Sequence, residues 1–197
     1  DICVVEGVMG LYDGDGSSTA MVAEALDLPV VLVVDASAGL ESVAATALGF
    51  REYAAVAGRD VDVVGVLAQR AHGGRHERGI REALPDGIDY LGRIPPAEDL
   101  SIPDRHLGLH MGTEAPLGAD ALAGASAHIE AERLVDVARE PPTPAATQRR
   151  APTGATVALA RDAAFRFLYP ATVERLRERA EVVTFAPTDG DSLPDPV

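Results

Sequence analysis

The sequence predicts an α/β protein built on a parallel β-sheet with helices on both faces. Short apolar runs rich in β-branched residues alternate with helical patterns along most of the chain. Strands that are buried on both faces are typically such continuous apolar runs, whereas half-exposed strands alternate in polarity. The length of 197 residues and the hydrophobic content of 47% are sufficient for one or two domains with a buried core.

The first half of the chain alternates between predicted strands and predicted helices. We expect strands at residues 2–5, 30–35, 61–67 and 89–91. We expect helices at residues 18–27, 40–57 and 76–84. Ser17 or Ser18 is suited to cap the first helix, and Pro85-Asp86-Gly87 is a turn signal that ends the third. The second helix carries one apolar stripe, made of Val43, Ala47, Phe50 and Ala54.

The second half contains a proline-rich interruption. Residues 94–104 carry three prolines and predict an irregular but ordered loop, and a helix is expected at 114–139. Residues 140–154 are rich in proline, polar and without periodicity, which is typical of a linker. A strand–helix–strand pattern follows, which we expect at 155–160, 170–179 and 181–185. About forty residues are too few for a domain, so this segment predicts the beginning of one.

Composition excludes several classes of function. The formal net charge is −14 and every basic residue is Arg, so a basic nucleic-acid-binding surface is not expected. Without Lys, the chain contains no Gly-x-x-x-x-Gly-Lys-Ser/Thr phosphate-binding loop. No run approaches the ~20 apolar residues of a membrane span. Cys3 is the only cysteine, which excludes an internal disulfide, fits a reducing cytoplasm and is expected to pack in a core strand.

Two carboxylates frame a glycine-containing loop after the first predicted strand. Glu6 follows the apolar run directly, and Asp13 lies at the far end of the same loop. Gly7 and Gly10 allow the backbone to take positive φ and to approach a ligand closely. A carboxylate at the carboxyl end of a strand, beside phosphates, is a common position for binding nucleotide-bound Mg²⁺. We therefore interpret this loop as a functional site, although a carboxylate that caps a helix is the simpler alternative.

Three other groups are candidates for ligand binding. Ser17 lies in the Ser/Thr-rich start of a helix, where backbone amides can bind an anion or a hydroxyl can cap the helix. Asp35 ends the most apolar strand, where it could bind a ligand or cap the helix that starts near residue 40. Gln69 and Arg70 follow the third strand, and Arg70 could equally form a surface ion pair.

Two histidine pairs invite a metal interpretation. His72 and His76 lie four residues apart, as do His106 and His110. A spacing of four residues without a third ligand is a weak indication of a metal site.

Five ordered motifs resemble the cobyrinic acid a,c-diamide synthase family. They are EGVMGLYDG at 6–14, GSSTA at 16–20, PVVLVVDA at 29–36, RHLGL at 105–109 and VALARDAAFRF at 157–167. The resemblance covers nearly the whole chain. It implies a P-loop, dethiobiotin-synthetase-like ligase domain at residues 1–139, a linker at 140–154, and the start of a class I glutamine amidotransferase-like domain at 155–197. The phosphate-binding loop and the amidotransferase cysteine are then expected outside this sequence, which would be a fragment without activity of its own.

The resemblance also implies roles for individual residues. Glu6 would bind Mg²⁺ on ATP, and Leu11, Tyr12 and Asp13 would face the substrate. Ser17, Asp35, Gln69 and Arg70 would bind the nucleotide, although relatives have Asn where this chain has Gln69. Arg105 and His106 would help to shape the active site. Phe165, Phe167 and Tyr169 would pack between domains or beside the substrate opening.

The implied activity is amidation in cobalamin biosynthesis. ATP would convert the a and c side-chain carboxylates of cobyrinic acid to acyl phosphates, and ammonia from glutamine would attack them. The implied setting is cytoplasmic, with Mg²⁺ as cofactor, no nucleic-acid or membrane partner, and a homodimer left open.

Several alternatives share these motifs. They are a,c-diamidation of Ni-sirohydrochlorin or of hydrogenobyrinic acid, a truncated nucleotide- or corrinoid-binding protein without catalysis, and a switch ATPase of the same nucleotide-binding fold. Amidation assays with each macrocycle distinguish the two alternative substrates. Corrinoid binding without turnover would favour the truncated binding protein.

Overall fold

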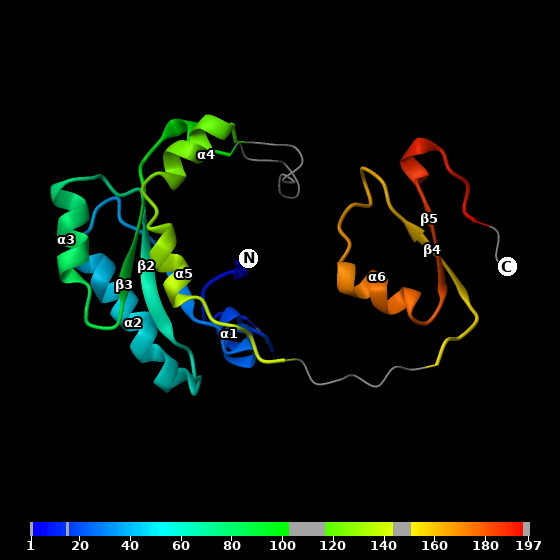
Figure 1. Cartoon of the computed structure of the whole chain (residues 1–197), viewed down its shortest axis with the longest axis horizontal. Coiled ribbons are helices and arrows are strands. Elements are labelled where there is room, and N and C mark those ends of the chain that lie inside the picture. Colours follow the sequence, from blue (N-terminus) through cyan, green and yellow to red (C-terminus); the bar gives the residue numbers. More distant parts are fainter. Residues whose placement is uncertain (1, 15, 103–116, 144–150, 195–197) are drawn as a thin grey trace. The chain divides into compact units, whose positions relative to one another are not determined.

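The computed structural model describes residues 2–14, 16–102, 117–143 and 151–194. The chain divides into two compact units, residues 1–143 and residues 144–197 (Figure 1). Both units are α/β structures with parallel strands, as the sequence predicts. Within the described residues, no helix is long and apolar enough to cross a membrane.

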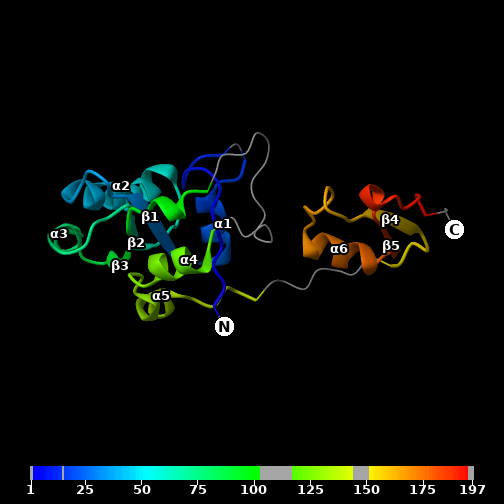
Figure 2. The same cartoon turned by 90° about the horizontal axis from the view of Figure 1, so that it is seen from above.

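The first unit is built on a three-stranded parallel sheet in the order β1-β2-β3. The strands are β1 (Val30–Asp35), β2 (Val63–Gln69) and β3 (Asp89–Ile94). The helices are α1 (Thr19–Leu26), α2 (Glu41–Ala57), α3 (Arg75–Ala83), α4 (Ala119–Ser126) and α5 (Ala131–Val137), with a 3₁₀ turn at Glu98–Leu100. Helices α2 and α3 lie on one side of the sheet, and α4 and α5 lie on the other (Figures 1 and 2).

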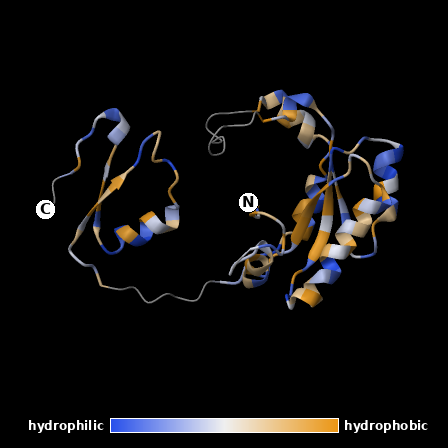
Figure 3. Ribbon diagram, turned by 180° about the vertical axis from the view of Figure 1, so that it is seen from behind, coloured by the Kyte–Doolittle hydropathy of each residue, from blue (hydrophilic) through white to orange (hydrophobic). Residues whose placement is uncertain are grey.

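The predicted elements between residues 18 and 94 are confirmed within one to three residues at most of their ends. Ser18 caps α1, because its Oγ accepts a hydrogen bond from the Met21 amide at 3.3 Å. The predicted stripe on α2 faces the core: Val43, Ala47 and Ala54 are buried, and Phe50 packs beside them. Strands β1 and β2 are apolar except at their last residues, Asp35 and Gln69, whereas the helices mix hydrophobic and hydrophilic residues (Figure 3).

The predicted strand at residues 2–5 is wrong. Residues 2–8 form no regular element, and Val4 is 87% exposed. Cys3 is also exposed, so the expectation of a core cysteine is wrong too. An apolar run becomes a strand only where a neighbour binds its backbone groups. Among the described residues, β1 pairs with β2 alone, and no strand lies beside residues 2–5.

The predicted single helix at 114–139 is also wrong in its described part; residues 114–116 lie outside it. The helix is interrupted between α4 and α5, where Ile129 forms an isolated antiparallel bridge with Gly92 of β3. The Arg93 amide donates to the His128 carbonyl at 3.0 Å, and the Glu130 amide donates to the Leu91 carbonyl at 3.0 Å. These bonds to the sheet replace the helical bonds that would join α4 to α5.

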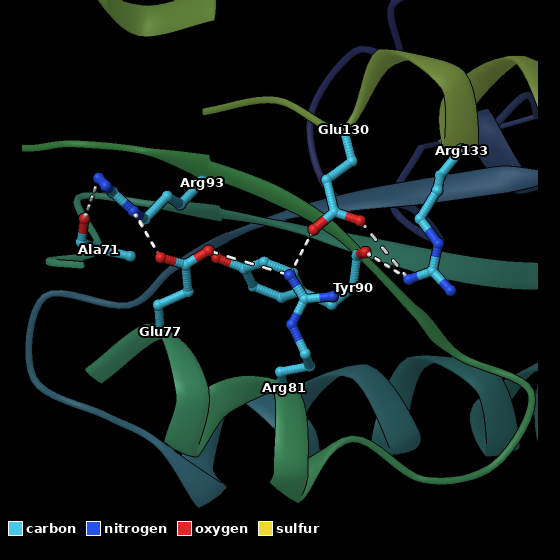
Figure 4. A network of polar contacts seen from close by, with 7 residues as sticks. All are labelled: Ala71, Glu77, Arg81, Tyr90, Arg93, Glu130 and Arg133. Carbon is cyan, nitrogen blue, oxygen red and sulfur yellow. Dashed lines mark hydrogen bonds and ion pairs between the residues drawn. The ribbon is translucent and has the colours of Figure 1, made fainter. Parts of the chain in front are cut away.

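A polar network fastens α5 and α3 to β3 (Figure 4). Arg93 donates to Glu77 at 3.1 Å, and the Arg81 guanidinium lies 4.5 Å from the ring centre of Tyr90 while it pairs with Glu130. Burial, followed by the charge of Glu77, raises the pKa of Tyr90 to about 12. The Tyr90 hydroxyl is buried and has no hydrogen-bond partner among the described residues.

The second unit contains two parallel strands joined by a helix. They are β4 (Thr156–Ala160), α6 (Pro170–Arg177) and β5 (Glu181–Phe185), followed by a 3₁₀ turn at Pro187–Asp189. The predicted strands and helix are thus confirmed. Asp162 connects the loop after β4 to the turn after β5. Its carboxylate accepts from the amides of Ala164 at 2.8 Å, Phe165 at 2.9 Å and Thr188 at 2.8 Å.

We predict that Asp162 makes this unit sensitive to acid. The Thr188 amide, followed by those of Phe165 and Ala164, lowers the pKa of Asp162 to about 2 from its ordinary value of 3.8. Because the folded-state pKa is depressed, the stability contribution is complete above about pH 4 and is lost as pH falls toward 2. Asp162→Asn should lower stability at pH 7 and flatten its decline between pH 4 and 2.

Denaturant unfolding at pH 7, 4, 3 and 2 measures this difference. Glu174→Gln on α6 is the control and should retain the wild-type dependence on pH. An Asp162→Asn protein that loses stability between pH 4 and 2 as steeply as wild type would contradict the prediction.

Candidate active site

A cavity of about 300 Å³ lies between the loop that carries Glu6 and the start of α1. Glu6, Asp13 and Ser17 all line it, so the structure brings together three of the candidate residues. The other lining residues are Val5, Gly7, Val8, Met9, Gly14, Ser18, Thr19 and Val22. Glu6 and Asp13 are exposed, and neither carboxylate has a polar side-chain contact among the described residues. Both are available to a ligand.

Thr19 clamps the first part of this loop to α1. Its Oγ1 accepts a hydrogen bond from the Val8 amide at 3.2 Å and donates one to the Val8 carbonyl at 3.2 Å. Gly7 packs directly against it: a Cβ on Gly7 would lie 2.5 Å from the Thr19 Cγ2. The hydroxyl thus binds both backbone polar groups of Val8, two residues after Glu6.

A turn places Asp13 over Gly10. The Asp13 amide donates to the Gly10 carbonyl at 3.1 Å, and the Asp13 carboxylate lies where a side chain on Gly10 would be. The turn is tied to α1, because the Ala20 amide donates to the Leu11 carbonyl at 2.8 Å. Gly10 is therefore needed for close approach of a carboxylate rather than for a positive φ.

Leu11 and Tyr12 turn toward the protein rather than the cavity. Leu11 is 7% exposed and belongs to a core cluster with Ala20 and Ala54. The Tyr12 hydroxyl donates to the Phe50 carbonyl of α2 at 2.6 Å, and burial raises the pKa of Tyr12. Neither residue lines the cavity.

Asp35, Gln69 and Arg70 form a second polar group, at the carboxyl ends of β1 and β2. Asp35 and Gln69 are opposite each other in the parallel ladder, and the Gln69 side chain is exposed. Arg70 has φ of 56° and pairs with Asp35 through two contacts, one of them 3.1 Å from Nε to Oδ1. Arg70, followed by the Ser37 amide, lowers the pKa of Asp35 to about 2. The ion pair considered for Arg70 is therefore confirmed.

Asp35 does not cap α2. Its Oδ1 accepts from the Ser37 amide at 3.0 Å, while α2 begins at Glu41 after Leu40, with no side-chain cap. The alternative role of Asp35 as an N-cap is thus wrong, because the chain turns for five residues before the helix starts.

The histidines give no metal centre among the described residues, which contain no group of three or more His, Cys, Asp or Glu side chains able to bind one. Both ring nitrogens of His76 contact the backbone, at the His72 amide (3.2 Å) and the Gly39 carbonyl (2.9 Å). Arg105, His106 and His110 lie outside the described residues. Mg²⁺ needs fewer protein ligands, since it commonly retains waters and binds one or two carboxylates plus phosphates. Glu6 and Asp13, two unpaired carboxylates on one cavity, fit that ion.

Sequence reasoning missed Thr19 as a clamp, and it missed the contact between Tyr12 and α2. Thr19 stands within a motif, yet no local pattern shows which backbone groups its hydroxyl binds. The contact between Tyr12 and Phe50 joins residues 38 positions apart. Only the packing of α2 beside the loop reveals it.

A family model described as "AAA domain" matches residues 1–104, which include the loop, the cavity and the three-stranded sheet. The chain belongs to this AAA domain family. No solved structure matches the chain.

Three curated relatives are similar to the chain along nearly its whole length. Over 98% of its length it is 68% identical to a protein of Halobacterium salinarum named cobyrinate a,c-diamide synthase, of which it covers 44%. It is 64% identical to a protein of the same name from Haloarcula marismortui, covering 99% of the chain and 45% of the relative. A Rhodobacter capsulatus protein named hydrogenobyrinate a,c-diamide synthase is 39% identical, and the match covers 100% of the chain and 47% of that relative. The resemblance to this group of synthases is confirmed, and the chain spans under half the length of these relatives.

We predict that Thr19→Val releases the loop that carries Glu6. The substitution keeps the shape that packs on Gly7 but removes the hydroxyl bound to Val8. Loss of the hydrogen bond that the Val8 amide donates should accelerate hydrogen exchange at this amide by about 3- to 10-fold. Thr46→Val is the control, because the Thr46 hydroxyl donates only to Ser42 within α2, at 2.8 Å. An unchanged exchange rate at the Val8 amide in Thr19→Val would show that Thr19 does not hold the loop.

Proposed function

We propose that this chain is part of an enzyme that amidates the a and c side-chain carboxylates of cobyrinic acid, using ATP and glutamine, in cobalamin biosynthesis. The observation that carries the proposal is the cavity shared by Glu6, Asp13 and Ser17. This cavity lies within the segment that matches the AAA domain family. We name cobyrinic acid as the substrate because the chain is 68% and 64% identical to proteins named cobyrinate a,c-diamide synthase.

The chemistry explains why such a cavity is needed. A carboxylate is a poor electrophile, so ATP transfers its terminal phosphoryl group to the carboxylate oxygen and releases ADP. Ammonia then attacks the carbonyl carbon of the acyl phosphate, inorganic phosphate leaves with the C–O bond electrons, and a proton is lost as the amide forms. Mg²⁺, held by Glu6 and Asp13, would offset the negative charge on the phosphates. Ser17, at the start of α1, would lie near the same anion.

The strand ends would bind the nucleotide. Gln69 presents an exposed side-chain amide, which can pair with the donor and acceptor edge of adenine. Arg70 forms an ion pair with Asp35. The two residues would therefore act on the nucleotide as a pair, beside Gln69. Asp13 would bind the same Mg²⁺ from the side of the cavity that faces the substrate, and Leu11 and Tyr12 would fix its backbone.

The remaining parts of the machinery would come from the rest of the protein. We propose that residues 140–154 are a linker and that residues 155–197 belong to a class I glutamine amidotransferase-like domain, which supplies ammonia by way of a cysteine nucleophile. The β4–α6–β5 unit supports this assignment. The phosphate-binding lysine is proposed to lie elsewhere, since these 197 residues contain no Lys. We also propose a cytoplasmic location, and homodimer formation stays a prediction.

Hydrogenobyrinic acid is the second candidate substrate. Relatives named hydrogenobyrinate a,c-diamide synthase match 98–100% of the chain, but at 39% identity. Parallel assays of the native protein with cobyrinic and hydrogenobyrinic acid decide between them, and we expect faster amidation of cobyrinic acid.

We predict that Glu6→Gln and Asp13→Asn each lower amidation of cobyrinic acid by the native protein by about 10²-fold or more, because each removes charge from the metal site. Excess Mg²⁺ should partly restore turnover. Glu52→Gln, an exposed carboxylate on α2, is the control and should retain wild-type activity. Activity above half of wild type in both site variants would refute the assignment.

A further inference from the structure

We propose that α2 positions Asp13 through Tyr12, with Phe50 and Tyr53 as the positioning residues on the helix. Tyr12 is then a positioning residue, which does not touch substrate. This inference rests on the proposed function for its catalytic consequence, but its structural part can be tested alone.

Tyr12 is held by α2 at three points. Its hydroxyl donates to the Phe50 carbonyl at 2.6 Å. Its ring stacks on the Phe50 ring with centroids 6.2 Å apart and planes 13° apart. The Tyr53 ring meets it edge-on at 5.1 Å. Such aromatic pairs and a hydrogen bond each contribute to ordering, and here they act on a single side chain of the loop.

The anchored ring lies next to Asp13 in the chain. Positive φ occurs on both sides of it: Met9, Gly14 and Gly16 have φ of 63°, 139° and 85°. This conformation is unfavourable for a residue with a side chain, such as Met9, and depends on the surrounding contacts. The Asp13 carboxylate itself has no polar partner among the described residues. Its position therefore depends on the backbone of residues 10–13, which is fixed by buried Leu11 and by Tyr12.

The orientation of the Tyr12 hydroxyl argues against direct catalysis. Its proton is donated to a main-chain carbonyl of α2, and the ring packs against the core cluster that contains Leu11 and Ala54. Tyr12 does not line the cavity of Glu6 and Asp13. A residue that transferred a proton to substrate would have to leave all three contacts with α2.

The test uses the native full-length protein with Tyr12→Phe, Tyr12→Leu and Tyr53→Leu. Hydrogen exchange at the Asp13 amide, which donates to Gly10, reports the order of the turn. We expect exchange about 3-fold faster in Tyr12→Phe and Tyr53→Leu, and at least 10-fold faster in Tyr12→Leu. Tyr169→Phe, an exposed tyrosine of the second unit, is the control and should leave this rate unchanged.

Kinetics separate positioning from catalysis. Tyr12→Phe should retain at least a tenth of wild-type kcat, while Tyr12→Leu should lose about 10²-fold in kcat with KM for ATP little changed. Two outcomes overturn the inference: Tyr12→Phe as inactive as Tyr12→Leu with unchanged exchange at Asp13, or unchanged exchange in both Tyr12→Leu and Tyr53→Leu. If wild type amidates neither macrocycle, the proposed function fails, and the exchange rates still decide whether α2 orders the loop.

Discussion

The candidate site depends on the attachment of one glycine-containing loop to two helices. Thr19 of α1 binds both polar backbone groups of Val8, Leu11 is buried in the core, and Tyr12 is bound to α2. Residues 2–8 form no regular element, and Met9 has a positive φ that is unfavourable for a residue with a side chain, so tertiary contacts hold the loop. Because these contacts hold the loop, two exposed carboxylates can be presented on one cavity. The site is thus built by packing, and not by hydrogen bonds to the carboxylates themselves.

Local patterns were sufficient for the elements that form independently of distant contacts. The apolar run at 30–35, the cap at Ser18 and the turn at Pro85 were all predictable, because each signal lies within a few residues of the structure it specifies. The run at 2–5 has the same composition as a strand, yet β1 pairs only with β2 among the described residues. The helix expected across 127–130 is interrupted because Ile129 bridges Gly92, a contact that no local pattern contains.

The candidate site shows the same division. Glu6, Asp13 and Ser17 were predictable as neighbours because the loop and the following helix are adjacent in sequence. A surface ion pair was one of two alternatives for Arg70, and its partner was not predicted, since Asp35 lies on another strand and meets it through the parallel register. Tyr12 illustrates the limit of motif reasoning: its place in EGVMGLYDG suggests contact with substrate, whereas its hydroxyl is bound to α2. A motif identifies a segment, but side-chain direction is set by packing.

The most direct test of the account is to locate the metal ion in the native protein. Crystals grown with Mn²⁺ in place of Mg²⁺ and a non-hydrolysable ATP analogue give an anomalous signal at the ion. We expect that signal about 2.1 Å from a Glu6 carboxylate oxygen, with Asp13 bound directly or through one water. An ordered nucleotide whose metal ion is bound by other carboxylates, with the Glu6 loop remote from the phosphates, would contradict the central claim.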